Sequence, residues 1–125
     1  MGVKKGEVLV VDDQLGVRAL LSMALKDRGF SVETATNGQE GVDKIKEINS
    51  DLVIMDVKMP VKDGVEALYE MKNLYPNTHI IMMTAYSEGY TVEAIKKGGA
   101  DKFIIKPFDI EYLMNYVDNV FAQKG

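Results

Sequence analysis

Short apolar runs alternate with amphipathic segments along the whole chain. Five runs rich in Val, Ile, Leu or Met have the length and composition of buried strands. They are Glu7–Val11, Phe30–Thr36, Leu52–Met55, His79–Met83 and Lys102–Ile105. A segment with apolar residues at helical spacing follows each run. Because parallel strands need long crossover connections that are usually helices, this alternation predicts an α/β fold.

The helical segments have recognisable starts and ends. Asn37, followed by Glu40 three residues later, has the pattern of a capping box. The expected helices are Leu15–Arg28, one that Asn37 caps, Val65–Leu74, Tyr90–Lys97 and one that Asp109 caps. In the first helix, an apolar stripe is expected to face the core: Val17, Leu20, Leu21, Ala24 and Leu25.

The five strand–helix units predict one doubly wound (βα)5 domain over residues 1–125, with no segment left for an output domain. Right-handed crossovers place helices on both faces of a parallel sheet. The runs VLVV, LVIM and IIMM are the most apolar, so they belong in the centre, and the second and fifth runs belong at the edges. This predicts a flavodoxin-like strand order of 2-1-3-4-5.

Composition excludes several classes of function. The 125 residues contain no cysteine, which rules out disulfides, thiolate metal sites and cysteine nucleophiles. A formal net charge of −4 without a basic patch argues against direct nucleic-acid binding. No apolar run approaches the length of a membrane span, and the N-terminus lacks the pattern of a signal peptide. We therefore expect a cytoplasmic protein with no membrane contact.

Polar side chains stand where four of the apolar runs end. Asp12 and Asp13 follow the first run, Asp56 the third, Thr84 the fourth and Lys106 the fifth. The carboxyl ends of parallel strands lie along one edge, where open α/β folds bind their ligands. Each side chain alone is explained as well by a cap, a turn or a loop position. The three aspartates together favour a functional site.

The chemistry of this set points to a magnesium ion and a phosphoryl group. The adjacent carboxylates of Asp12 and Asp13 repel each other unless a cation lies between them. Magnesium prefers oxygen ligands and commonly bridges to phosphate, so Asp12, Asp13 and Asp56 form a predicted magnesium site that Mn²⁺ could also occupy. A cis bond between Lys106 and Pro107 would direct the Lys106 ammonium group into the same crevice.

Four segments resemble the signature segments of bacterial two-component response-regulator receiver domains, the CheY-like domains. They are VLVVDDQLGVRALL, DLVIMDVKMPVKDG, IIMMTAY and GGADKFIIKPFD, and the match that they define spans essentially the whole chain. Their order and spacing are highly specific. The pattern is most similar to the stand-alone receivers of sporulation-type phosphorelays.

The resemblance implies a role for each acidic residue. Asp56 matches the aspartate that takes a phosphoryl group from the phosphohistidine of a partner. Asp13 resembles the direct magnesium ligand, and Asp12 the neighbour that acts mainly through water. Lys58 would offer its backbone carbonyl to the metal while its side chain faces solvent.

The resemblance also implies a conformational switch. Thr84 and Lys106 match the residues that hold the phosphoryl oxygens. In the family, phosphorylation draws the threonine inward, and an aromatic residue on the last strand follows it. Phe103 is the matching residue here, where many members have tyrosine, and it lacks a hydroxyl group.

A receiver acts by binding, so the resemblance implies a partner surface. The expected partner is a sensor histidine kinase or a histidine phosphotransferase, and the protein is expected to be a monomer that could dimerise weakly on phosphorylation. The residues expected on this surface are Gln14, Leu15, Val17, Tyr86, Pro107 and Phe108, with Leu21 as a further candidate. Val17 and Leu21 could instead be core residues of the first helix. Such a protein catalyses only its own phosphorylation and slow dephosphorylation.

Two other functions use similar folds. Phosphatases of the haloacid-dehalogenase type also form an aspartyl phosphate, but their first strand ends in D-x-D, whereas this chain has VVDDQLG. A flavin mononucleotide carrier needs a phosphate loop rich in glycine and hydroxyl groups, and the carboxylates of DDQLG would repel the flavin phosphate. The magnesium-dependent phosphatase is the stronger of these alternatives.

Overall fold

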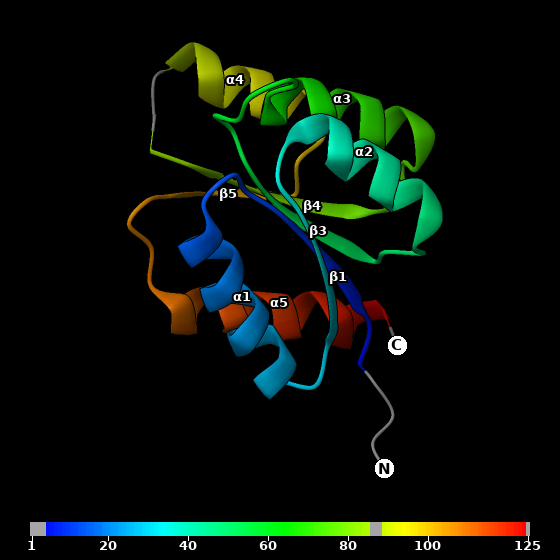
Figure 1. The fold of residues 1–125 in the computed structure, drawn as a ribbon, viewed down its shortest axis with the longest axis vertical. Helices are drawn as coiled ribbons and strands as arrows, with labels where there is room; N and C mark the ends of the chain where they lie inside the picture. The colour runs from blue at the N-terminus through cyan, green and yellow to red at the C-terminus, as the bar shows by residue number, and fades with distance from the viewer. Residues whose placement is uncertain (1–4, 86–88, 125) are drawn as a thin grey trace.

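A five-stranded parallel sheet forms the centre of the fold (Figure 1). The computed structural model describes residues 5–85 and 89–124. The strands are β1 (Glu7–Val11), β2 (Ser31–Ala35), β3 (Leu52–Asp56), β4 (His79–Thr84) and β5 (Lys102–Ile105). Their order is β2-β1-β3-β4-β5, which confirms the predicted flavodoxin-like arrangement.

Five helices cover the two faces of the sheet (Figure 1). They are α1 (Leu15–Asp27), α2 (Gly38–Glu47), α3 (Gly64–Leu74), α4 (Gly89–Lys97) and α5 (Ile110–Lys124). Helices α1 and α5 pack on one face, and α2, α3 and α4 on the other. No helix in the described part of the chain is long and apolar enough to cross a bilayer.

The central strands are buried from both sides. In β1, Leu9 and Val11 pack with α2 and α3, while Val8 and Val10 pack with α1 and α5. All five residues of β3 are buried. Two-sided burial explains why these strands are continuous apolar runs rather than alternating ones.

Side-chain caps fix the starts of three helices. The Asn37 side chain accepts a hydrogen bond from the Glu40 N–H at 2.8 Å, as the capping pattern predicts. Asp63 accepts from the Glu66 N–H at 2.9 Å, and Asp109 caps α5 in the same way. Because α2 and α3 begin directly after loops at the carboxyl edge of the sheet, these caps also fix the loops there.

The expected stripe of α1 is wrong at one position. Leu21 and Leu25 are fully buried, and Val17 and Ala24 pack partly against the same core. Leu20 is 50% exposed. Consecutive residues point about 100° apart around a helix, so Leu20 falls outside the face that Leu21 and Leu25 bury.

Candidate functional site

The sheet brings the predicted strand-end residues to one edge, on the left of Figure 1. Strands β1 and β3 are neighbours, so Asp12 and Asp13 follow β1 beside Asp56 at the end of β3. One carboxylate oxygen from each of these aspartates lies within 4.8 Å of the others. The three carboxylates therefore converge as the sequence predicts.

Asp12 is held by several contacts. Its side chain is fully buried. The Oδ1 atom accepts a hydrogen bond from the Gln14 N–H at 2.8 Å, and Oδ2 lies 3.1 Å from Lys106 Nζ. The Arg18 guanidinium donates to the Asp12 carbonyl oxygen at 2.8 Å, a contact that no pattern in the sequence predicts. Asp13 is exposed.

Lys106 bridges two of the carboxylates. Its Nζ atom lies 3.1 Å from Asp12 Oδ2 and 3.3 Å from Asp56 Oδ1. The peptide bond between Lys106 and Pro107 is cis. Burial alone lowers the pKa of Lys106, but the two carboxylates outweigh it and raise the pKa overall. Lys106 is therefore a fixed cation inside an acidic site.

The electrostatics of Asp56 suit a bound cation. Its side chain is 10% exposed, and burial is the main reason that its pKa is raised. The charge of Asp12 raises the pKa further, while Lys106 lowers it. Ionised Asp56 therefore carries an unfavourable charge that a single lysine does not balance. Three oxygen ligands around this excess of negative charge match the preference of Mg²⁺.

Two glycines allow the chain to turn tightly around Asp56. A Cβ atom at Gly64 would lie 2.0 Å from the Asp56 carbonyl oxygen, so no side chain fits there. A Cβ atom at Gly38 would lie 2.2 Å from the Lys62 carbonyl oxygen. Gly38 also donates its N–H to that oxygen at 3.0 Å. The loop after β3 is thus packed against the starts of α2 and α3.

Comparison with known proteins identifies the family. Residues 8–118 match the model of the response regulator receiver domain. The chain belongs to this family. It is 38% identical over 119 residues to sporulation initiation phosphotransferase F of Bacillus subtilis, covering 95% of this chain and 96% of that protein. It is 39% identical over 116 residues to the chemotaxis protein CheY of Halobacterium salinarum, covering 93% of this chain and 97% of that protein.

Other similarities extend this assignment. The chain is 43% identical over 107 residues to the regulatory protein AtoC of Escherichia coli, covering 85% of this chain but only 23% of AtoC. The crystal structure of a CheY-like receiver domain protein from Methanospirillum hungatei has a TM-score of 0.91 at 28% identity, covering 98% of this chain and 96% of that one. A chain in the crystal structure of the CheX–CheY–BeF3–Mg complex from Borrelia burgdorferi has a TM-score of 0.87 at 33% identity. The match covers 93% of this chain and 89% of that one.

The remaining predicted site residues occupy different environments. Thr84 is fully buried at the end of β4, and its carbonyl accepts a hydrogen bond from the Lys106 N–H at 2.8 Å. Phe103 is partly buried against the core beneath α2, α3 and α4. Lys58 lies two residues after Asp56 and is exposed, as expected. The metal-binding role of the Lys58 carbonyl stays a prediction.

The expected partner surface divides into exposed and packed residues. Gln14 and Pro107 are exposed, and Leu15 is 72% exposed. Val17 and Phe108 are partly buried and pack against the core beneath α1 and α5. Leu21 is fully buried there, so it is a core residue. Tyr86 lies outside the described residues.

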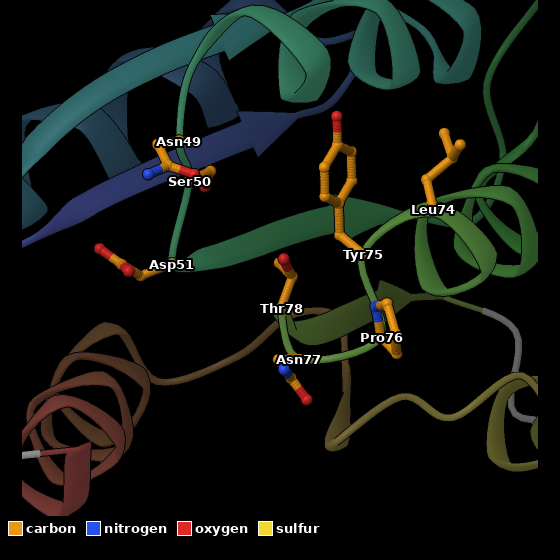
Figure 2. A pocket seen from close by; sticks show the side chains of 8 residues that line it. All are labelled: Asn49, Ser50, Asp51, Leu74, Tyr75, Pro76, Asn77 and Thr78. Carbon is orange, nitrogen blue, oxygen red and sulfur yellow. The ribbon is translucent and has the colours of Figure 1, made fainter.

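A separate cavity lies at the opposite edge of the sheet, around the starts of β3 and β4 (Figure 2). Its volume is about 330 Å³. The lining residues are Asn49, Ser50, Asp51, Leu74, Tyr75, Pro76, Asn77 and Thr78. Asp51 is the one acidic residue among them, and none of the converging carboxylates or Lys106 lines this cavity.

Proposed function

We propose that Asp56 accepts a phosphoryl group from a phosphohistidine of a partner protein. The observation that carries this proposal is the surroundings of Asp56. Two further carboxylates have oxygens within 4.8 Å, and Lys106 Nζ lies 3.3 Å from Asp56 Oδ1. Phosphoryl transfer depends mostly on positioning and on neutralising charge, and this edge of the sheet supplies both.

We propose that Asp12, Asp13 and Asp56 hold Mg²⁺, with Mn²⁺ as a possible substitute and the Lys58 carbonyl as a further ligand. When bound, the ion supplies positive charge that offsets the carboxylates and the phosphoryl oxygens. Asp12 is already held by the Gln14 N–H and Lys106 Nζ, so it orients the site. Asp13 is the exposed ligand, open to solvent.

The chain's own residues carry the transfer. A carboxylate oxygen of Asp56 forms a bond to phosphorus as the bond between phosphorus and the imidazole nitrogen of the donor breaks. The electron pair of the broken bond stays on that nitrogen, and the imidazole, protonated on its other nitrogen, leaves as a neutral group. Asp56 reacts as a carboxylate, so no proton has to be removed from it. Lys106 and Thr84 then hold the phosphoryl oxygens by donating hydrogen bonds to them. The product is an aspartyl phosphate whose slow hydrolysis returns the free carboxylate.

We propose that Thr84 and Phe103 transmit the phosphorylation of Asp56 to the surface around β5. Phe103 borders two cavities of about 240 and 330 Å³, the first shared with Ile95 and Ala100 and the second with Phe108 and Tyr112. A partly buried ring that borders open hollows has more room to change its rotamer than a ring enclosed on all sides. A movement of Thr84 toward a phosphoryl group would thereby alter the surface around β5.

The proposed partner is a sensor histidine kinase or a histidine phosphotransferase. Phosphotransferase F, to which this chain is similar over nearly its whole length, is named as a phosphotransferase of sporulation. Exposed Gln14, Leu15 and Pro107 border the acidic site and are the strongest candidates for contact. Action without an output domain, a cytoplasmic location and the monomeric state stay predictions.

The experiment is phosphorylation by acetyl phosphate with Mg²⁺, measured by intact-protein mass spectrometry. The wild-type protein should gain one phosphoryl group, and Asp56→Asn should gain none. Asp51→Asn is the matched control because Asp51 precedes the other end of the same strand. Profiling against candidate sensor kinases would then identify the donor.

Two results would contradict the proposed function. Phosphorylation of Asp56→Asn at the wild-type level would refute the assignment of the acceptor. Multiple-turnover hydrolysis of many phosphate esters that survives this substitution would favour the phosphatase alternative, which the family assignment does not support.

A further inference from the structure

The two arginines of the α1 region have contrasting surroundings. Arg28, at the C-terminal end of α1, forms ion pairs with Glu111 and Asp118 of α5 at 2.9 and 2.5 Å. Arg18 lies in the first turns of α1 and forms no ion pair with a described carboxylate. A cation near a helix N-terminus is disfavoured by the helix dipole. The position of Arg18 therefore needs another explanation.

The Arg18 side chain instead contacts the peptide that joins the two adjacent aspartates. Its Nη1 atom donates a hydrogen bond of 2.8 Å to the Asp12 carbonyl oxygen. That carbonyl belongs to the peptide plane between Asp12 and Asp13. The orientation of this plane sets the direction in which the Asp13 side chain leaves the backbone.

Few contacts of the Asp13 side chain itself fix this direction. It is exposed, and no described residue donates a hydrogen bond to its carboxylate. Asp12 differs, because the Gln14 N–H and Lys106 Nζ fix both of its carboxylate oxygens. Arg18 thus restrains the less constrained of the two aspartates through the backbone.

We propose that Arg18 is a positioning residue that pre-orients Asp13 for Mg²⁺, an inference that rests on the proposed function. Ordering a ligand before the metal arrives raises affinity, because less conformational entropy is lost on binding. Groups that hold metal ligands in place commonly change affinity by a factor of about 10 to 100. Arg18 acts on one ligand through one backbone contact, so the lower end of this range is expected.

The test is Mg²⁺ binding by isothermal titration calorimetry to the wild-type, Arg18→Ala, Arg18→Lys and Arg28→Ala proteins. Arg18→Ala should weaken binding by about tenfold. Arg18→Lys should recover part of the loss, because an ammonium group can also donate to the Asp12 carbonyl. Arg28→Ala, the matched control at the other end of α1, should bind Mg²⁺ within about twofold of the wild type.

A second measurement separates positioning from a general structural role. In acetyl phosphate reactions, Arg18→Ala should need about tenfold more Mg²⁺ for the half-maximal rate but reach a similar rate at saturation. Equal Mg²⁺ affinity in the wild type and Arg18→Ala would overturn the proposed role of Arg18 and would leave the proposed function of the site untouched. A saturating rate that falls while the affinity stays unchanged would also overturn it. A wild-type protein that binds no Mg²⁺ would instead remove the proposed function.

Discussion

The two edges of the sheet both carry aspartates, but they use them differently. At the amino edge, Asp51 accepts a hydrogen bond from the Glu7 N–H at 3.2 Å, and Asp101 accepts from the Ile80 N–H at 2.7 Å. At the carboxyl edge, Asp12 and Asp56 share Lys106, and exposed Asp13 has an oxygen within 4.8 Å of both of these neighbours.

The difference has a simple physical origin. The first residues of a strand present N–H groups that a carboxylate can satisfy, so acidic residues stabilise the amino edge. At the carboxyl edge of this sheet, three carboxylates converge around one lysine, and burial raises the pKa of Asp56. In this sheet, the aspartates at the amino edge thus satisfy strand N–H groups, whereas those at the carboxyl edge converge on one another and on Lys106.

The largest effect should follow from removing the lysine at the carboxyl edge. Lys106→Ala should slow phosphorylation by acetyl phosphate about 100-fold, because one preorganised donor to the developing charge is lost. Lys72→Ala is the matched control, since Lys72 lies near an aspartate at the other edge, with Nζ 3.9 Å from Asp101 Oδ2. It should leave the rate unchanged. If Lys106→Ala were phosphorylated at the wild-type rate, Lys106 would contribute no more to the reaction than Lys72, which contradicts this prediction.

The rise in unfolding temperature on adding Mg²⁺ should depend on the aspartates of the carboxyl edge and not on those of the amino edge. At about ten times its dissociation constant, Mg²⁺ should stabilise the wild type by about 1.4 kcal/mol. This corresponds to a rise of about 5 °C in the unfolding temperature. Asp13→Asn should lose most of the shift, whereas Asp101→Asn should keep it. Equal shifts in both variants would mean that the ion does not bind at the carboxyl edge.

The same substitution should have opposite effects on stability at the two edges. Because the pKa of Asp56 is raised, its contribution to stability is present below the ordinary carboxyl pKa and is lost as pH rises through the raised value. At pH 7 without metal, Asp56→Asn should therefore raise the free energy of unfolding. Asp101→Asn should lower it by about 1 kcal/mol, because the hydrogen bond to the Ile80 N–H becomes weaker.

Urea unfolding in EDTA measures both variants. The gain from Asp56→Asn should shrink as the pH falls toward 4, since protonated Asp56 then resembles the amide. Destabilisation by Asp56→Asn at pH 7 would contradict the electrostatic account of the carboxyl edge. Stabilisation by Asp101→Asn would contradict the structural role of Asp101 at the amino edge.

The strand order and the residues at the strand ends were predictable from the amino-acid sequence. Both depend on local signals: the length of apolar runs, helix caps such as Asn37, and the handedness of crossovers. Because parallel strands end at one edge, Asp12, Asp56 and Lys106 could be assigned to one site before any contact was known. The family resemblance added the roles of these residues, and the match over residues 8–118 confirms the family.

The contact partners and the burial of individual side chains became known from the folded structure. Lys106 contacts Asp12 across 94 positions of the chain, a pairing that no local pattern specifies. The structure also assigned Leu21 to the core and Leu20 to the surface, and it placed the Arg18 guanidinium on the Asp12 carbonyl. Burial depends on the helix or strand that packs above a residue, and such packing joins segments that are distant in the sequence.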